Sequence, residues 1–193
     1  MSMDGKHRSF QEQVEKQPDY RYDVRNEIII NNDTMIFEEE YNVKVLMLNG
    51  SAKANGNTYA SLLEVGRQLE KEGIEYEIFQ MGGEPVRDCL GCGQCTENGC
   101  VFADDKVNEF VAKAKEADGF VFGTPVYYAH PSGRVMSFLD RAFYSSGSAA
   151  FAFKPGASVA VARRGGTTAS FDAAVQCDQT VNFTSLYQII HTV

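Results

Sequence analysis

Residues 43–58 read Val43-Lys-Val-Leu-Met-Leu48-Asn49-Gly-Ser-Ala-Lys-Ala-Asn-Gly-Asn-Thr58. The first six are almost continuously apolar, which is typical of a strand that is covered on both faces. The polar, glycine-containing loop is followed by a helical pattern whose apolar residues share one face and which ends at Gly73. A buried strand, a polar loop and a helix in this order predict the start of a parallel α/β sheet.

The same alternation continues along the chain. Gly119–Gly123 and Ala157–Ala162 are further apolar runs, whereas Ile74–Ile78 alternates apolar with charged residues as an edge strand does. Helical patterns follow Asp104-Asp105, Pro131 and the region near Thr167. We therefore predict a doubly wound parallel sheet with three α/β/α layers, in which ligands bind beyond the carboxyl ends of the strands.

The two ends of the chain differ from this pattern. Residues 1–42 form a predicted arm with a short helix from Phe10 and a hairpin between Glu27 and Phe37; we favour a solvated arm over one that joins the sheet or a partner. Residues 43–193 form the predicted domain. Leu186–Ile190 is expected as its fifth strand, which leaves the C-terminal strand and helix short or missing. Such a sheet face needs cover from the arm or a second subunit, unless the chain is truncated.

Composition excludes several classes of function. The chain has 193 residues and a formal net charge of -8, and residues 1–42 carry 10 acidic against 5 basic side chains. Because no basic stripe is present, nucleic-acid binding is not expected. No apolar run reaches the roughly 18–20 residues that cross a bilayer, and the polar start lacks the apolar middle of a secretory signal. We therefore expect a cytoplasmic protein without membrane partners.

The first loop has the composition of a phosphate-binding loop. Hydroxyl, amide and lysine side chains can surround an anion together with the helix N-terminal amides; the candidates are Ser51, Lys53, Asn55, Asn57 and Thr58. The loop matches neither the Walker A pattern nor G-x-G-x-x-G. The alternative is that Asn57 or Thr58 only caps the helix.

This loop resembles the FMN phosphate loop of the NADPH-dependent FMN reductases, which have a flavodoxin-like fold. Thr124-Pro-Val-Tyr-Tyr128 looks like the family's loop against the isoalloxazine ring, and Arg163-Arg-Gly-Gly-Thr167 is similar to the loop on the other side of the flavin. The resemblance implies FMN contacts from these two loops, which are the residues Thr124, Pro125, Val126, Tyr127, Tyr128, Arg163, Arg164, Gly165, Gly166 and Thr167.

The chemistry of these residues agrees with a flavin site. The two tyrosines can form a wall for the ring, and backbone amides near Val126 or Gly165 can donate to its pyrimidine edge. We expect one of the two arginines near the electron-rich edge of the ring. The alternatives are core or interface packing for the tyrosines and a solvated surface pair for the arginines.

Four of the five cysteines lie within 12 residues, at Cys89, Cys92, Cys95 and Cys100. This spacing is tighter than that of structural zinc sites and is the ferredoxin-like way of holding a cubane cluster. The arrangement resembles the iron–sulfur flavoprotein branch of the FMN reductases, which implies one [4Fe–4S] cluster beside FMN. A zinc site, a redox dithiol and an empty reduced loop are the alternatives. Cys177 is expected to be a buried apolar residue.

The expected function is that of an FMN-dependent oxidoreductase. The resemblance implies electron transfer from NAD(P)H or a ferredoxin-type donor to a small acceptor such as a flavin or quinone, and a homodimer or homotetramer. Alternatives are a non-enzymatic flavodoxin-like electron carrier, or a plain NAD(P)H:FMN or quinone reductase with an empty cysteine loop.

Overall fold

A computed structural model describes residues 42–96, 98–146, 150–179 and 188–192, with side chains through Ala174. Residues 42–193 form one compact unit. The helix and hairpin predicted for the arm, and the side chain of Cys177, lie outside the described part, so these expectations stay predictions.

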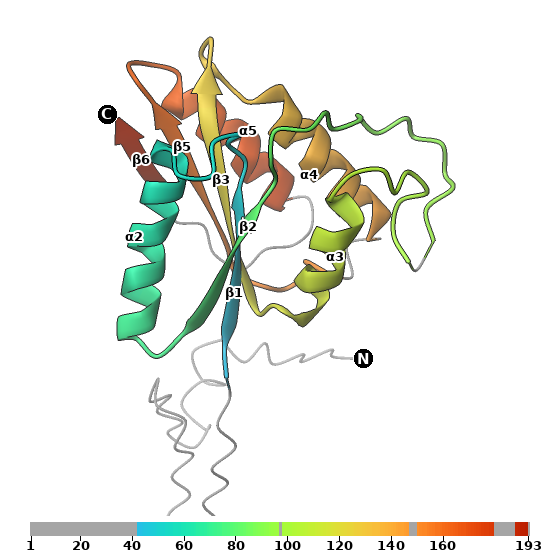
Figure 1. Ribbon diagram of the computed structural model, residues 1–193, viewed down its shortest axis with the longest axis horizontal. Helices are drawn as coiled ribbons and strands as arrows, with labels where there is room; N and C mark the ends of the chain where they lie inside the picture. Colours follow the sequence, from blue (N-terminus) through green and yellow to red (C-terminus); the bar gives the residue numbers. More distant parts are fainter. Residues whose placement is uncertain (1–41, 97, 147–149, 180–187, 193) are drawn as a thin grey trace, which may run out of the picture. The chain divides into compact units, whose positions relative to one another are not determined.

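The centre of the unit is a parallel sheet in the order β2-β1-β3-β5-β6 (Figure 1). Its strands are β1 Lys44–Asn49, β2 Glu75–Gln80, β3 Gly119–Tyr127, β5 Gly156–Ala162 and β6 Gln188–Thr192. When these five parallel strands are numbered along the chain, without the short strand β4, their order in the sheet is 2-1-3-4-5, which is the flavodoxin-like arrangement. The chain leaves β1 toward one edge and β3 toward the other, so the switch point lies between these two strands.

Helices cover both faces of the sheet (Figure 1). They are α2 Asn57–Lys71, α3 Val107–Glu116, α4 Gly133–Ser145 and α5 Thr167–Gln179. α2 packs on one face and α3 and α4 on the other, while α5 contacts β5 and α4. The predicted doubly wound fold is thereby confirmed. None of the described helices is both long and apolar enough to cross a membrane.

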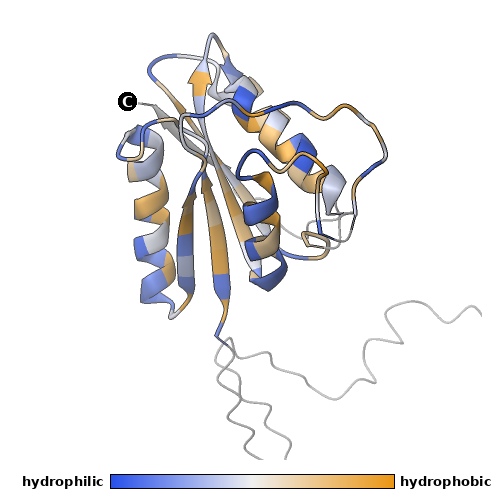
Figure 2. Cartoon of the chain, turned by 45° about the vertical axis from the view of Figure 1, so that its right-hand side comes forward, coloured by the Kyte–Doolittle hydropathy of each residue, from blue (hydrophilic) through white to orange (hydrophobic). Residues whose placement is uncertain are grey.

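Each face of the sheet has its own apolar core. The central strands carry mostly apolar residues (Figure 2). Under α3 and α4 the core is aromatic: the Phe110 ring lies 5.2 Å from Phe79 and 5.3 Å from Phe138, between ring centroids. Under α2, Leu62 packs with Met47, with Val121 of β3 and with Val159 and Val161 of β5. The inward faces predicted for the helices after Asp105 and Pro131 are confirmed, since the apolar residues expected to face inward are all buried: Val107, Phe110, Val111 and Ala114 in α3, and Val135, Phe138, Leu139 and Ala142 in α4.

One element differs from the prediction. β3 continues past Gly123 to Tyr127, because the short strand β4, His130–Pro131, turns back and pairs with it. The described part of the predicted fifth strand, from Gln188 to Ile190, lies within β6, and Leu186 and Tyr187 lie outside the described residues.

Candidate functional site

The loop after β1 begins at a close contact between two strands. The Gly50 amide donates a hydrogen bond of 2.9 Å to the carbonyl of Gly123 in β3. A β-carbon on Gly50 would lie 2.2 Å from Val135 Cγ2 and 2.6 Å from the Gly123 oxygen. Glycine is therefore required here, and the start of the loop is fixed at the switch point.

Two polar side chains at the ends of adjacent strands fix the shape of this loop. Asn49 Oδ1 accepts from the Ser51 amide (3.2 Å), and Asn49 Nδ2 donates to Gln80 Oε1 (2.5 Å). Gln80 Nε2 donates in turn to the Ser51 carbonyl at 2.7 Å, and Ser51 Oγ accepts from the Lys53 amide at 3.1 Å. Sequence reasoning missed Asn49 and Gln80; a polar residue at the last position of each strand was the available signal.

The N-terminus of α2 presents free amides beyond this loop. Gly56 occupies the N-cap position, and no side chain caps the helix, so the predicted capping role of Asn57 or Thr58 is not found. Thr58 is buried, and its Cγ2 lies 3.0 Å from where a β-carbon on Gly123 would be. The other candidates, Lys53, Asn55 and Asn57, are exposed. Uncapped first-turn amides and the helix dipole favour an anion here.

The second predicted flavin loop is a tight hairpin between β3 and β4. Its two turn residues, Tyr128 and Ala129, have φ of 53° and 67°, as in a type I′ turn. Non-glycine residues in this conformation cost roughly 1–2 kcal/mol each. Tyr127 is 59% exposed and Tyr128 is fully exposed, so neither packs in the core. Thr124 is buried, where its Oγ1 accepts from the Ser132 amide at 3.2 Å.

The third predicted loop touches this hairpin. Gly166 has φ of 96°, and a β-carbon on it would lie 2.4 Å from the Ala129 Cα. Arg163, Arg164 and Gly165 are exposed. Thr167 is buried at the start of α5. The three predicted loops thus follow β1, β3 and β5 at the same edge of the sheet (Figure 1).

The cysteine loop follows β2. Gly91, Gly93 and Gly99 all have positive φ, between 60° and 110°, which permits the repeated turns. Thr96 and Gly99 exchange both backbone hydrogen bonds, at 3.0 and 2.9 Å. In this antiparallel bridge Cys95 and Cys100 are the next residues opposite each other.

The four predicted metal ligands lie near enough to interact, but their side chains are not arranged around a common metal position. Burial raises the pKa of the Cys95 thiol, and the thiols of Cys100, Cys92 and Cys89 raise it further. All four thiols are free, and in the described part no three His, Cys, Asp or Glu side chains form a group that could hold a metal ion. Three thiols act on the fourth, that of Cys95, and four thiols are the kind and number of ligands that a cubane cluster takes. The cluster stays a prediction.

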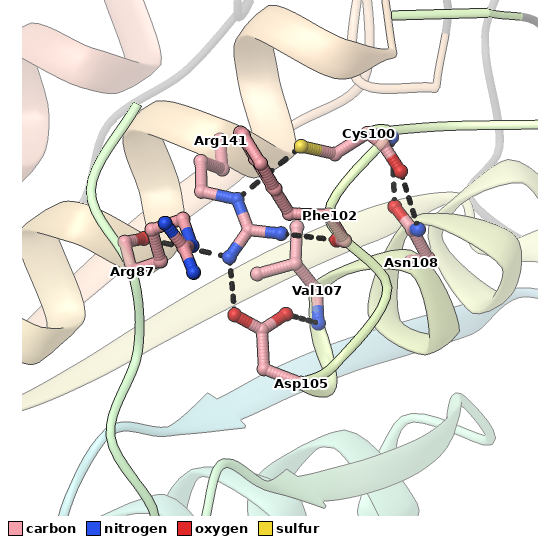
Figure 3. A network of polar contacts seen from close by, with 7 residues as sticks. All are labelled: Arg87, Cys100, Phe102, Asp105, Val107, Asn108 and Arg141. Atoms are coloured by element: carbon pink, nitrogen blue, oxygen red, sulfur yellow. Dashed lines mark hydrogen bonds and ion pairs between the residues drawn. The ribbon is translucent and has the colours of Figure 1, made fainter. Parts of the chain in front are cut away.

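An arginine that sequence reasoning missed lies beside Cys100 (Figure 3). Arg141 of α4 is 1% exposed and forms an ion pair with Asp105. Its Nε donates to Cys100 Sγ at 3.4 Å, and its Nη2 donates to the Phe102 carbonyl at 2.5 Å. Burial lowers the pKa of Arg141, but the hydrogen bonds to Cys100 and Asp105 outweigh it and leave the pKa raised. The guanidinium is therefore charged.

One pocket lies away from all of these loops. Its volume is about 510 Å³, and it is lined by Glu70 and by Gly73, Ile74, Glu75 and Tyr76, where α2 leads into β2. This is the opposite end of β2 from the cysteine loop. Its two glutamates disfavour an anionic ligand, so we do not assign the phosphate to it.

Comparison with known proteins places this geometry in a family. The model for NADPH-dependent FMN reductase matches residues 43–186. The chain belongs to this family. The matched segment contains all three predicted flavin loops and the cysteine loop of this FMN reductase family member.

Individual relatives agree with the family and with its predicted branch. An iron–sulfur flavoprotein of Methanocaldococcus jannaschii is 37% identical over 100 residues, which are 51% of this chain and 51% of that protein. The chain spans about half the length of the curated relatives it matches. The resemblance to the iron–sulfur flavoprotein branch of the FMN reductases is confirmed.

Solved structures confirm the flavodoxin-like fold of this FMN reductase family member. The NAD(P)H:quinone oxidoreductase from Methanothermobacter marburgensis aligns with a TM-score of 0.60 at 13% identity, covering 77% of this chain and 86% of that one. An archaeal flavodoxin aligns with a TM-score of 0.52 at 14% identity, covering 77% and 83%.

Proposed function

We propose that the chain binds FMN beyond the carboxyl ends of β1, β3 and β5 and transfers electrons from NAD(P)H or a ferredoxin-type donor to a small acceptor such as a flavin or quinone. The observation that carries this proposal is that an uncapped helix N-terminus follows β1 and two exposed tyrosines lie at the end of β3, the strand next to β1 at the switch point of the sheet. Membership in the FMN reductase family supports the same cofactor.

The phosphate of FMN is assigned to the first loop. The first-turn amides of α2 and the hydroxyls of Ser51 and Thr58 are its proposed donors. Lys53 adds a positive charge, and Asn55 and Asn57 add amide donors from the exposed side of the loop.

The ring is assigned to the two loops that touch each other. The proposed wall is formed by Tyr127 and Tyr128, and the backbone amides of Val126 and Gly165 are the proposed donors to the pyrimidine edge. Arg163 or Arg164 is proposed to lie near the electron-rich edge. When bound, FMN supplies the hydride and single-electron chemistry, so the residues bind and orient it.

The four cysteines are the proposed ligands of one [4Fe–4S] cluster. Their spacing, their common neighbourhood and the similarity to iron–sulfur flavoproteins support this. A second candidate is a reductase whose cysteine loop holds no metal, which is favoured by the lack of a metal-holding group among the described side chains.

A homodimer or homotetramer is part of the proposal. The full exposure of Tyr128 at the tip of the hairpin leaves an aromatic surface beside the site, and such surfaces are enriched at subunit contacts. A monomer in sedimentation would count against this part.

The function is tested by loading the purified chain anaerobically with FMN, iron and sulfide. We expect bound flavin absorbance that disappears when NAD(P)H or reduced ferredoxin is added, and NAD(P)H consumption in the presence of a quinone. A carrier would bind flavin but consume no NAD(P)H without a separate reductase. Iron and sulfide analysis separates the cluster form from the empty form, and absence of flavin binding would refute the proposal.

A further inference from the structure

We propose that Arg141 is a positioning residue for the cysteine loop. Arg141 holds the sulfur of Cys100 in place for iron, and it raises the reduction potential of the cluster. This inference rests on the proposed cluster. It concerns a residue on α4, outside the cysteine motif.

The guanidinium of Arg141 joins both ends of the cysteine loop (Figure 3). Before the first cysteine, the Arg87 carbonyl accepts from Nη1 at 3.4 Å. After the last cysteine, the Phe102 carbonyl accepts from Nη2 at 2.5 Å, and Asp105 pairs with Nη1. One side chain therefore connects the two ends of the segment that carries all four thiols.

Cys100 is held from two helices at once. Its backbone amide donates to Asn108 Oδ1 of α3, and its carbonyl accepts from Asn108 Nδ2, both at 2.8 Å. Its sulfur accepts from Arg141 Nε of α4 at 3.4 Å. Backbone and side chain are therefore both fixed, as expected of a preorganised ligand.

The contact of Arg141 with sulfur is separate from its ion pair. Burying an unpaired charge is unfavourable, and Asp105 supplies the partner through Nη1. Asp105 is itself anchored, because its Oδ1 accepts from the Val107 amide at 3.1 Å. A further donor of the Arg141 guanidinium, Nε, is directed at the sulfur of Cys100.

Such a contact acts on redox chemistry through the hydrogen bond to sulfur, which Arg141→Lys removes, and through charge, which Asp105→Asn changes. A hydrogen bond and a positive charge beside a thiolate ligand stabilise the more negative, reduced cluster, which raises its potential. Asp105 opposes this effect with its negative charge. The two partners of one ion pair therefore shift the potential in opposite directions when each is changed alone.

The same helix connects this site with the proposed flavin loops. α4 begins directly after Ser132, whose amide donates to Thr124 Oγ1 and to the Pro125 carbonyl at the base of the hairpin. Arg141 follows Gly133 by eight residues, which is about 12 Å along a helix. Arg141 thus holds the cysteine loop against the helix that starts at the hairpin.

The test compares Arg141→Lys and Asp105→Asn in the full chain, loaded anaerobically with FMN, iron and sulfide. Lysine keeps the charge of Arg141 but cannot donate to Cys100 and Asp105 as a planar fork. We expect Arg141→Lys to lower the cluster potential. We also expect a chelator to remove iron about 10-fold faster from this variant than from the wild type. Asp105→Asn should raise the potential, because it removes the opposing charge. Arg67→Lys is the matched control, because Arg67 forms an exposed ion pair with Glu64 on α2. This variant should change neither the cluster potential nor the loss of iron.

Unchanged potentials in both variants, or shifts in the same direction, would overturn the proposal and leave Arg141 a structural role. If Arg141→Lys does not fold, Asp105→Asn decides alone, and a potential that is unchanged or lowered refutes the idea. A wild type that binds FMN but no iron also overturns this inference, while the flavin part of the proposed function stands. Loss of FMN binding in the wild type would instead refute the proposed function.

Discussion

Gly166 lies against the backbone of Ala129, so close that a β-carbon on Gly166 would be 2.4 Å from the Ala129 Cα. This contact joins the loop after β5 to the hairpin after β3, although 36 residues separate the two in the sequence. The two loops assigned to the flavin ring are therefore one packed unit, and a change in either displaces the other.

Gly166→Ala is expected to destabilise the protein by roughly 1–3 kcal/mol. The new methyl meets backbone rather than a flexible side chain, and the φ of 96° is unfavourable for alanine. FMN affinity should fall with it. Urea unfolding and FMN titration measure the two effects. Gly83→Ala is the control, because its β-carbon meets nothing within 4 Å; equal stability of the two variants would contradict the close contact.

Tyr128→Asn is expected to weaken FMN binding without loss of stability. Asparagine tolerates the φ of 53° better than tyrosine does, and the fully exposed ring has no packing to lose. We expect the free energy of unfolding to stay equal or to rise by up to about 1 kcal/mol. Urea unfolding of the flavin-free chain and FMN titration test this. A clear loss of stability would show that the tyrosine is held by contacts within the chain.

Thr58→Val is expected to weaken FMN binding about 10-fold or more, since a hydrogen bond to a charged group contributes roughly 1.5–3 kcal/mol. Valine keeps the methyl that packs near Gly123. Riboflavin lacks the phosphate and serves as the internal control, so its affinity should not change. Equal losses for FMN and riboflavin would place the phosphate elsewhere.

Glu77→Gln is expected to reduce the pH dependence of stability. The hydrogen bond from Lys113 lowers the pKa of Glu77 below 4.5 despite burial, and Lys44 adds to this. A lowered carboxyl pKa gives stability that is present above pH 4.5 and is lost as the pH falls through the folded-state value. We expect a loss of roughly 0.5–1 kcal/mol at pH 7 and none at low pH.

Urea unfolding at several pH values measures this difference. Glu75→Gln, an exposed position on the same strand, is the matched control. A deficit of Glu77→Gln that persists unchanged below the folded-state pKa would contradict the ionic origin.

The sequence allows the fold to be predicted because its strands and helices carry strong local patterns. The run from Val43 to Leu48 predicts a strand with cover on both faces, and β1 is buried from Leu46 to Asn49. The spacing of Val107, Phe110, Val111 and Ala114 predicts one helical face, and all four are buried. These features depend on periodicity alone.

The parts of the site that sequence reasoning missed depend on contacts between distant residues. The β3–β4 hairpin was not predicted, because its turn, Tyr128-Ala129, lacks the glycine or asparagine that usually marks a type I′ turn. Arg141 was not predicted as a site residue, because an arginine on a helix is usually exposed. Its position three residues after the buried Phe138, on the same helical face, was the available signal.

Equilibrium dialysis of the chain against FMN and, separately, against riboflavin tests the central claim most directly. We predict that FMN is retained at one per chain and that riboflavin is bound more weakly, because the free amides of α2 receive the phosphate. Failure to retain FMN, or equal retention of the two flavins, would contradict the proposed site.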